Sequence, residues 1–316
     1  MNHRSLQKKS KLSRLPHTPT VTVAVCAHNE AQNIGDFLRS VLRQQEDGFV
    51  LRDILVISDG STDSTVREVK KIRSKKIHVI DYPKRIGKSS HLNTLYRSLT
   101  SDILVQSDAD VTFANQKVIK NIIKPLKDSQ TIAMCGGHPT PLKAKTFTES
   151  AVNCTCEVFL ALRQRVRGGN NVLSADGRLL AFRRELVKQI TVPADMIAND
   201  AFAYFCCKYI GYGYCYVKSA VVNFRSPQTL RDQIRQNTRF NAASLRMKKY
   251  FPKSLVKQEY QIPAGLVLPL MLKQFTLHPI KCTYVFIVNR YCQYKARCVE
   301  RKLSALWQIA QTTKHL

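Results

Sequence analysis

The sequence predicts an α/β protein with a mostly parallel sheet flanked by helices and a helical C-terminal appendage. Over about the first 110 residues, short apolar runs alternate with helical patterns, which is typical of parallel strands joined by crossover helices. Charged or polar clusters follow the apolar runs. The length of 316 residues and the hydrophobic content of 44% suit one large domain with an appendage.

The first half contains the regular part of this pattern. Residues 33–45 place Ile34, Phe37 and Val41 on one helical face, and the other expected helices follow the same reasoning. The expected strands are 21–27, 54–57, 77–80 and 103–105, and the expected helices are 33–45, 63–73 and 89–99.

The second half is mixed. Strands are expected at 131–135 and 214–224, and helices at 119–126, 147–167, 201–210 and from residue 227 onward. In this last helix Arg231, Arg235 and Arg239 have i, i+4, i+8 spacing, so they share one face. Gln236 lies three residues before Arg239 and shares that face too.

Asp108 and Asp110 follow directly on the apolar run 103–105, where a buried strand is expected to end. Open α/β sheets bind ligands outside the carboxyl ends of their strands. Two carboxylates so close together favour a hard divalent cation, Mn²⁺ or Mg²⁺, which usually also binds substrate phosphates. An isolated Asp-x-Asp is otherwise an ordinary polar loop.

Other strand ends carry similar groups. Because the carboxyl ends of parallel strands meet at one sheet edge, these clusters are expected to form a single site. The clusters are His28 with Glu30, Asp59, Arg85 with Lys88, and Asp108 with Asp110.

The net charge of +28 implies an anionic partner, which can be a nucleic acid, an acidic membrane surface or a phosphorylated substrate. No nucleic-acid-binding motif is recognisable, so nucleic acid is not expected as a partner. No apolar stretch reaches the length of about 18 residues that a membrane-spanning helix needs. The 10 cysteines lack zinc-site spacing and are interpreted as buried thiols in a reducing cytosol, which predicts a cytoplasmic protein.

Three regions are expected: a basic disordered arm at 1–20, the α/β domain at 21–250 and the helical appendage at 251–316. In the appendage, apolar runs within 262–306 alternate with cations and aromatic residues. This pattern suits a helix lying in the interface of an anionic membrane, peripheral on the cytoplasmic face. A helical hairpin packed on the main domain is the alternative.

Together these motifs resemble the family 2 inverting glycosyltransferases, whose Rossmann-like nucleotide-sugar-binding fold is called GT-A. The resemblance covers roughly residues 20–250. Each motif is short, but their order along the chain is that of the family. The motifs are Ala27-His28-Asn29-Glu30, Ser58-Asp59-Gly60-Ser61-Thr62-Asp63, Gly87-Lys88, Asp108-Ala109-Asp110, Gly177 with Phe182-Arg183-Arg184, Asn199-Asp200, and Gln236-Asn237-Thr238-Arg239-Phe240.

The resemblance implies a role for each matched residue. It makes Asp200 the catalytic base and Asp110 the metal ligand, with Gln236 and Arg239 bordering the diphosphate and the acceptor. A hydroxyl that attacks an anomeric carbon needs such a base, and the leaving diphosphate needs positive charge near it. The residues implied to bind the nucleotide sugar, with UDP-sugar the expected donor, are Ala27, His28, Glu30, Asp59, Arg85, Lys88, Asp108 and Ala109.

Some positions depart from the family pattern. His28 stands where Tyr is frequent, Asn199 precedes Asp200 in place of Glu, and Phe240 replaces the Trp of the Gln-x-x-Arg-Trp motif of processive synthases. Those synthases also have transmembrane helices, and no such helix is recognisable in this sequence. Transfer of one or a few sugars to a saccharide or lipid-linked acceptor is therefore expected here.

Alternatives remain open at this stage. Asp59 and Asp200 also suit helix caps, and the basic residues also suit solvated charges. Two other functions use similar features: a catalytically silent protein that binds sugar nucleotides, and a nucleotidyltransferase. Release of pyrophosphate from a nucleoside triphosphate would identify the latter.

Overall fold

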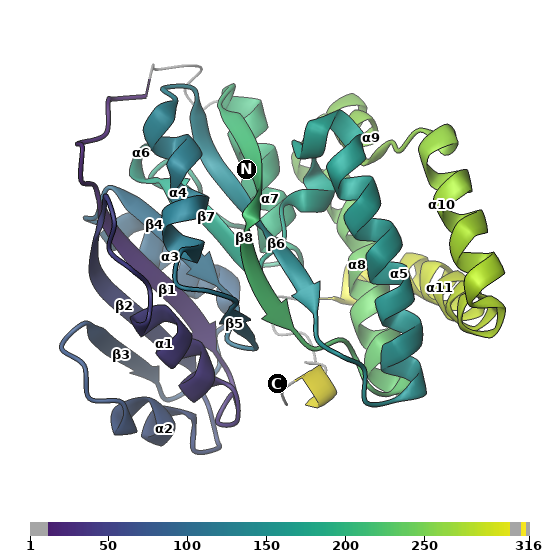
Figure 1. The fold of residues 1–316 in the computed structure, drawn as a ribbon, viewed down its shortest axis with the longest axis horizontal. Helices are drawn as coiled ribbons and strands as arrows, with labels where there is room; N and C mark the ends of the chain where they lie inside the picture. The colour runs from purple at the N-terminus through teal and green to yellow at the C-terminus, as the bar shows by residue number, and fades with distance from the viewer. Residues whose placement is uncertain (1–11, 304–310, 314–316) are drawn as a thin grey trace.

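A single mixed sheet organises the protein (Figure 1). The structure, a computed structural model, describes residues 12–303 and 311–313, and these contain an 8-stranded sheet of order β3-β2-β1-β4-β7-β6-β8-β5. The strands are β1 (Thr20–Ala27), β2 (Val50–Asp59), β3 (Ile77–Tyr82), β4 (Ile103–Ser107), β5 (Val111–Phe113), β6 (Ile132–Pro141), β7 (Leu179–Arg183) and β8 (Gly213–Phe224).

The first half of the sheet is parallel, as predicted. β1 pairs with β2 and β4, and β2 pairs with β3, all in parallel, so that Ala27 at the end of β1 lies beside Ser58 near the end of β2. The second half is mixed: β7 runs antiparallel to both β4 and β6, β5 runs antiparallel to β8, and β6 and β8 are parallel. The α/β fold is confirmed, and its parallel part brings the ends of β1, β2 and β4 to one edge.

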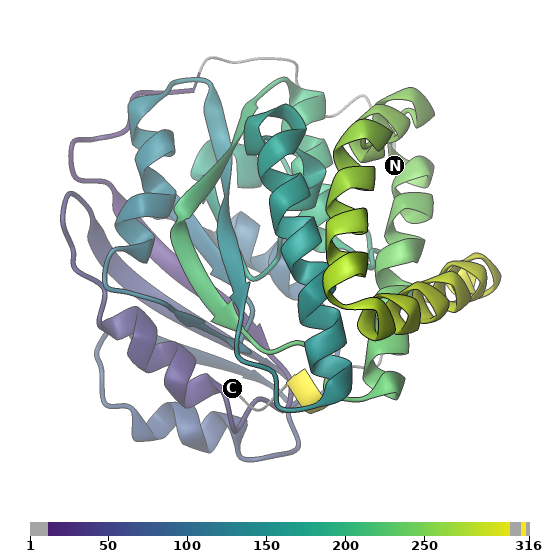
Figure 2. The ribbon, with the colours of Figure 1, turned by 45° about the vertical axis from the view of Figure 1, so that its right-hand side comes forward.

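Helices cover both faces of the sheet, and the later ones extend beyond it (Figures 1 and 2). The helices around the sheet are α1 (Ile34–Leu42), α2 (Thr65–Lys71), α3 (Lys88–Ser98), α4 (Val118–Asp128), α6 (Arg184–Val187) and α7 (Asn199–Ile210). The others are α5 (Phe147–Arg165), α8 (Leu230–Tyr250), α9 (Lys253–Tyr260), α10 (Ala264–Leu277) and α11 (Pro279–Val299), with 3₁₀ turns at 166–169, 172–174, 300–302 and 311–313.

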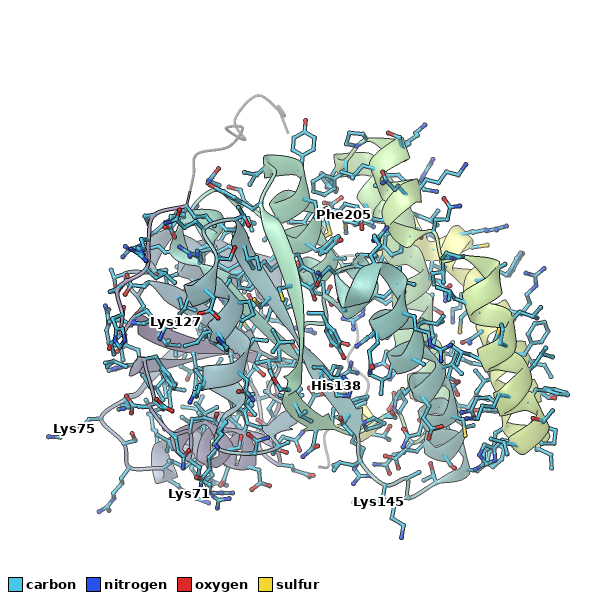
Figure 3. All side chains as sticks on the ribbon, turned by 45° about the horizontal axis from the view of Figure 1, so that its top comes forward. Lys71, Lys75, Lys127, His138, Lys145 and Phe205 are labelled. Carbon is cyan, nitrogen blue, oxygen red and sulfur yellow. The ribbon has the colours of Figure 1, made fainter. Side chains whose placement is uncertain are left out.

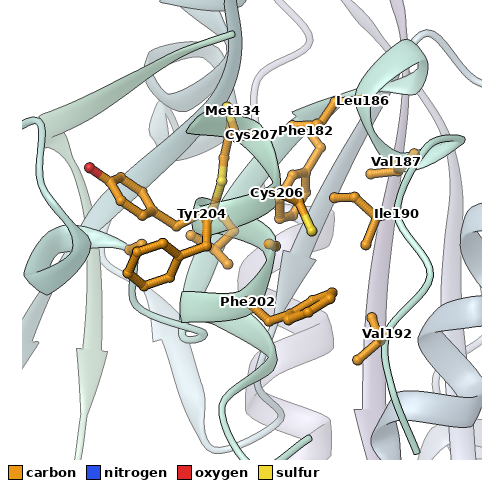
Figure 4. Close-up of a cluster of buried hydrophobic side chains, with 14 of the residues drawn as sticks. Met134, Phe182, Leu186, Val187, Ile190, Val192, Phe202, Tyr204, Cys206 and Cys207 are labelled. Carbon is orange, nitrogen blue, oxygen red and sulfur yellow. The ribbon is translucent and has the colours of Figure 1, made fainter. Parts of the chain in front are cut away.

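The core lies on both sides of the sheet because successive side chains of a strand point to opposite faces. In β1, Val23 and Val25 pack with Phe37 of α1 on one face, while Ala24 faces the other side. The second side is filled by β6, β7 and α7, where Phe182 and its neighbours are buried together (Figure 4).

Helices α5 and α8 have capped N-terminal ends, and α5 is also tied to the sheet. The Oγ1 of Thr146 caps α5 by accepting from the amide of Glu149, and the Glu149 carboxylate forms a buried ion pair of 2.8 Å with Arg225 just after β8. Thr229 caps α8 in the same way through the amide of Asp232. The ion pair holds the start of α5 beside the end of β8, close to the site.

The structure describes only part of the arm expected at 1–20. There, Leu12 is buried in the core and the Ser13 carbonyl accepts a hydrogen bond from Arg183. Residues 1–11 lie outside the described residues. Lys75 and Lys145 are examples of lysines that point away from the body of the molecule (Figure 3).

None of the described helices combines the length and the apolar character that crossing a membrane requires. Beyond α9, α10 and α11 form a hairpin that packs on α5 and α8, as the packed alternative predicted. No residue of α10 is buried. The hairpin stands out clearly at one side of the molecule (Figure 2).

Candidate active site

One cavity of about 610 Å³ opens at the carboxyl edge of the sheet, between the strand ends and helices α5, α8 and α11. Every site residue that the sequence predicted lies on its wall. These residues are Ala27, His28, Glu30, Asp59, Arg85, Lys88, Asp108, Ala109, Asp110, Asp200, Gln236 and Arg239.

Asp59, at the end of β2, holds the basic loop that leads into α3. Its Oδ1 accepts from the amide of Ile86 at 2.7 Å, and both of its oxygens lie within 3.2 Å of the amide nitrogen of Gly87. Gly60 allows this approach because a Cβ there would lie 2.5 Å from the Arg85 nitrogen, and because its φ is 62°. The loop therefore follows the end of β2 closely.

His91 on α3 gives Asp59 a further partner. Its Nε2 lies 2.8 Å from Asp59 Oδ1, and both side chains are buried. Burial opposes ionisation of Asp59, but the hydrogen bonds from His91 and from the loop amides outweigh it, so that the Asp59 pKa is lowered. Nothing in the local sequence pattern links positions 59 and 91, so this contact could not be predicted.

The end of β1 packs against the same turn. The Nδ1 of His28 lies 2.8 Å from the Asp59 carbonyl and donates to it, because a carbonyl can only accept. The Glu30 amide bonds the Thr65 hydroxyl at 2.7 Å, and the Glu30 carboxylate is bonded by Asn33. His28 and Glu30 are therefore positioned by backbone and helix contacts at the cavity wall.

The carboxylates after β4 lie opposite cations. Lys88 Nζ is 2.5 Å from Asp108 Oδ1. Burial alone would lower the Lys88 pKa, but Asp108 together with the nearby Cys26 and Asp200 outweighs burial and raises it. Asp110 lines the cavity two residues further on, and its negative charge together with that of Asp108 helps to raise the pKa of Arg178.

Asp200 lies in the first turn of α7, next to Gly177. Its Oδ1 accepts from its neighbour Ala201 at 2.8 Å and its Oδ2 from the Gly177 amide at 3.2 Å. Burial, and then the charge of Asp176, raise the Asp200 pKa. A carboxyl with a raised pKa at the base of a cavity is suited to accept a proton.

A cluster around Asp176 completes this wall, and the sequence did not single it out as part of the site. Arg178 bonds both carboxylate oxygens of Asp176, at 3.1 and 2.9 Å, while Arg163 reaches the Asp176 carboxylate from α5 at 2.8 Å. Burial opposes the charge of Asp176, but the two guanidinium groups outweigh it and hold the Asp176 pKa far below its usual range. The charged run Asp176-Gly177-Arg178 between apolar segments was the signal that could have found it.

Arg178 also lies against an aromatic ring. Its guanidinium carbon is 3.7 Å from the centroid of Phe224 at the end of β8. Across the cavity, α8 contributes Gln236 and Arg239, and burial lowers the Arg239 pKa despite the opposing charge of Asp200. The cavity thus has its carboxylates on the sheet side and cations on both sides of them.

The described residues contain no group of three or more His, Cys, Asp or Glu side chains that could enclose a metal ion. Asp108 and Asp110 can supply one or two carboxylate oxygens. This set fits a Mg²⁺-like ion, which takes one or two carboxylates and completes its shell with water and substrate phosphate. It does not fit a structural zinc site.

The fold and this cavity define the class of protein, a glycosyltransferase with the GT-A fold. Residues 22–191, more than half of the chain, match the domain described as "Glycosyl transferase family 2". The chain therefore belongs to glycosyl transferase family 2.

Curated relatives are similar over part of the chain. The 4,4′-diaponeurosporenoate glycosyltransferases of Staphylococcus aureus strains RF122 and USA300 are 32% identical over 126 residues, which is 38% of this chain and 32% of theirs. The match spans only about a third of those enzymes.

Solved structures of sugar transferases share the fold. The mannosyltransferase PcManGT of Pyrobaculum calidifontis, in complex with GDP-Man and Mn²⁺, has a TM-score of 0.56 at 20% identity over 93% of this chain and 78% of its own. The mannosyl-3-phosphoglycerate synthase of Rubrobacter xylanophilus has a TM-score of 0.52 at 15% identity, over 78% of each chain. The glucosyl-3-phosphoglycerate synthase of Mycobacterium tuberculosis, in complex with Mn²⁺, UDP and phosphoglyceric acid, has a TM-score of 0.50 at 18% identity, over 72% of this chain and 78% of its own.

Proposed function

We propose that this protein is a metal-dependent inverting glycosyltransferase that moves a sugar from a nucleotide-sugar donor to a saccharide or lipid-linked acceptor. The observation that carries the proposal is the convergence of Asp200 and Asp108 on Gly177, since an oxygen of each lies 3.6 Å from the position of a Gly177 Cβ. A sugar held there would lie close both to a donor-side carboxylate and to a proton acceptor.

The nucleotide would lie along the ends of β1, β2 and β4. His28, Glu30 and Asp59 line this part of the cavity and would border the nucleoside. In the structure Asp59 accepts from the loop amides and His91, so its first role is to hold Arg85 and Lys88 at the cavity. Lys88, Arg178 and Arg239 would stabilise the diphosphate as it gains negative charge on leaving.

Asp110, with Asp108 beside it, would hold a divalent cation, Mn²⁺ or Mg²⁺. Such an ion, when bound, neutralises charge on the diphosphate. Asp108 is bonded to Lys88 through Oδ1, which leaves its Oδ2 directed toward Gly177. Gln236 and Arg239 would border the diphosphate from α8, in a Gln-x-x-Arg-Phe variant of the motif of processive synthases.

The reaction needs one base. Asp200 would take the proton of the acceptor hydroxyl as its oxygen bonds the anomeric carbon and the bond from that carbon to the phosphate oxygen breaks. The bonding electrons leave with the nucleoside diphosphate. A single displacement of this kind inverts the anomeric configuration, and it needs only one carboxylate on the acceptor side.

We further propose that the α10–α11 hairpin, although it packs on α5 and α8, binds an anionic membrane surface through its exposed side. The hairpin exposes large apolar side chains, including Leu272, Phe275, Ile280, Phe286 and Ile287, and Ile280 is 75% exposed. From residue 261 to residue 299 the chain has Lys and Arg but no Asp or Glu. Exposed apolar residues interspersed with cations favour an interfacial helix on an acidic leaflet. All ten cysteines are free thiols, which supports the cytoplasmic face.

A donor screen tests this function. Thermal shift with UDP and GDP, each with and without Mn²⁺, would identify the nucleotide, and hydrolysis of the corresponding nucleotide sugars would identify the donor. Asp110→Asn keeps the shape but removes the charge, so we expect it to abolish the Mn²⁺-dependent part of the shift. The exposed Asp81 at the end of β3 provides the control Asp81→Asn. An unchanged Mn²⁺ dependence in Asp110→Asn would refute the metal assignment.

A further inference from the structure

The part of the cavity away from the sheet has a different chemistry from the part just described. The carboxylates of its wall all come from strand ends and from the β7 and α7 region, while α5, α8 and α11 contribute none. In their place, two helices carry side-chain amides. We call these the amide row, and its members are Gln233, Asn237 and Asn241 on α8, and Asn289 and Gln293 on α11.

The spacing of the amide row makes it one surface. The three residues on α8 have i, i+4, i+8 spacing and the two on α11 have i, i+4 spacing, so each set lies along one helical face. The two faces meet where Asn237 Nδ2 donates to Asn289 Oδ1 at 2.7 Å. Asn241 extends the row through a bond of 2.8 Å to the Asn237 carbonyl.

Gln233 marks where a ligand would bind. Its side chain is fully buried, its Oε1 accepts from the Tyr284 hydroxyl at 2.8 Å, and its Nε2 has no hydrogen-bond partner among the described residues. A buried donor is normally satisfied, so an unpaired one on a cavity wall indicates a missing partner. If the amide is turned round, its oxygen is left unpaired in the same place.

The walls around the amide row are apolar and aromatic. Val152, Phe159 and Leu160 of α5 line the cavity, and Phe159 and Phe240 are 44% and 50% exposed. Of the cations nearby, Arg235 pairs with Asp232, and Arg163 shares Asp176 with Arg178. The amide row itself contains no charged side chain, so it favours a neutral ligand over an anionic or a cationic one.

We propose that the amide row binds the acceptor, and that the acceptor is a neutral saccharide. Each amide both donates and accepts hydrogen bonds, as a sugar hydroxyl does, and the aromatic faces suit the C–H faces of a pyranose. This inference rests on the proposed function, since it identifies the acceptor class of the same cavity. The sugar belongs either to a free saccharide or to a lipid-linked one.

The experiment measures binding of small glycosides by saturation-transfer NMR, with the full chain and no nucleotide. The probes are methyl glucoside, methyl mannoside and methyl N-acetylglucosaminide, with glucuronate and glucose 6-phosphate as charged counterparts. We expect binding of at least one neutral glycoside and a loss of about 5-fold or more in affinity in Gln233→Leu, the usual scale for an unpaired hydrogen bond. The matched control is Gln258→Leu, an exposed amide on α9 outside the cavity.

Gln293→Leu covers the case in which the buried substitution impairs folding, because Gln293 is exposed at the edge of the cavity. The Gln293→Leu substitution should weaken binding of the same glycoside while leaving the circular dichroism spectrum of the protein unchanged. Absence of neutral-glycoside binding, stronger binding of the charged counterparts, or equal affinity in the folded variants would each overturn the inference.

Two further measurements are needed. One distinguishes a free from a lipid-linked saccharide, and the other tests the acceptor class separately from the proposed transfer reaction. Tighter binding of octyl than of methyl glycoside identifies a lipid-linked saccharide, and equal binding identifies a free one. Thermal shift with UDP or GDP and Mn²⁺ is recorded in parallel. Nucleotide binding without glycoside binding refutes the acceptor class alone, whereas glycoside binding without nucleotide binding refutes the proposed transfer reaction alone.

Discussion

Asp108 and Asp200 both border Gly177, and an oxygen of each lies 3.6 Å from the point that a Gly177 Cβ would occupy. This separation is ordinary van der Waals contact, so a methyl group fits beside the two carboxylates when the cavity holds no substrate. A donor sugar would need the same space.

Gly177→Ala should therefore fold normally and still bind the nucleoside diphosphate, but turn over at least about 10²-fold more slowly, the scale for a misplaced reacting centre. Turnover with saturating nucleotide sugar checks this, together with the nucleotide affinity from calorimetry. Gly265→Ala is the matched control, since nothing lies within 4 Å of its Cβ position. Full activity in Gly177→Ala would show that the sugar does not occupy the space beside the two aspartates.

Asp200→Asn removes the proton acceptor and keeps the shape of the side chain. We expect turnover to fall by about 10²-fold or more, the usual contribution of a positioned base, while donor affinity stays nearly unchanged. Single-turnover kinetics and calorimetry with the nucleotide sugar separate these quantities. A collapse of donor affinity with surviving turnover would assign Asp200 to the donor pocket.

The pH dependence follows from the raised pKa of Asp200, which burial and Asp176 cause. A base works only when it is ionised, so kcat/KM should fall as the pH drops through that pKa. The midpoint of the acid limb should therefore lie above the ordinary aspartate value of 3.8. The pH profile of kcat/KM measures this midpoint. A midpoint at or below the ordinary aspartate value would exclude Asp200 as the group that titrates.

Asp59 is expected to hold the basic loop. Asp59→Ala would leave the amides of Ile86 and Gly87 and the His91 ring without their acceptor. Leaving buried donors unsatisfied should cost about 3 kcal/mol of the free energy of unfolding and should weaken nucleotide binding, because the loop carries Arg85 and Lys88.

Urea denaturation and calorimetry with UDP or GDP check both effects. Asp81→Ala is the control, an exposed aspartate one strand away. Loss of stability without any loss of nucleotide affinity would mean that the loop does not contact the nucleotide.

The hairpin is predicted to bind anionic vesicles. Phe286→Ser and Ile287→Ser would each remove an exposed apolar side chain of α11, 64% and 61% exposed. Each substitution should weaken binding roughly 10-fold, since a buried apolar side chain contributes about 1.5 kcal/mol or more. Co-sedimentation with vesicles of acidic lipid measures this.

Added salt should weaken the same binding, because the Lys and Arg contributions are screened. Ile80→Ser, at an exposed position on β3, should have no effect. If the wild-type chain remains in the supernatant at low salt, the hairpin does not bind a membrane.

Much of the first half of the fold could be predicted from local patterns. Apolar runs followed by polar clusters located the strands, and parallel strands end at one edge for geometric reasons. This is why residues as distant in sequence as Asp59 and Asp108 were expected to lie close together, and both line the same cavity. The short strand β5, Val111–Phe113, was not predicted because 3 residues are too few to show a period.

Local sequence patterns do not show which distant segments pair with each other. β7 was an apolar run without a visible direction, and only its hydrogen bonds to β4 and β6 make it antiparallel. The link between His91 and Asp59, and the ion pair of Asp176 with Arg163 of α5, depend in the same way on tertiary packing.

The sequence by itself determined which charged and polar residues lie at the sheet edge, because a continuous apolar run that forms a buried strand ends where polar residues begin. Only the tertiary structure decided what faces that edge. The amides of α8 and α11 form one surface because Asn237 and Asn289, on helices far apart in the chain, come within 2.7 Å. Contacts of this kind are selected by how whole helices pack, and the periodicity of either helix alone does not specify its partner.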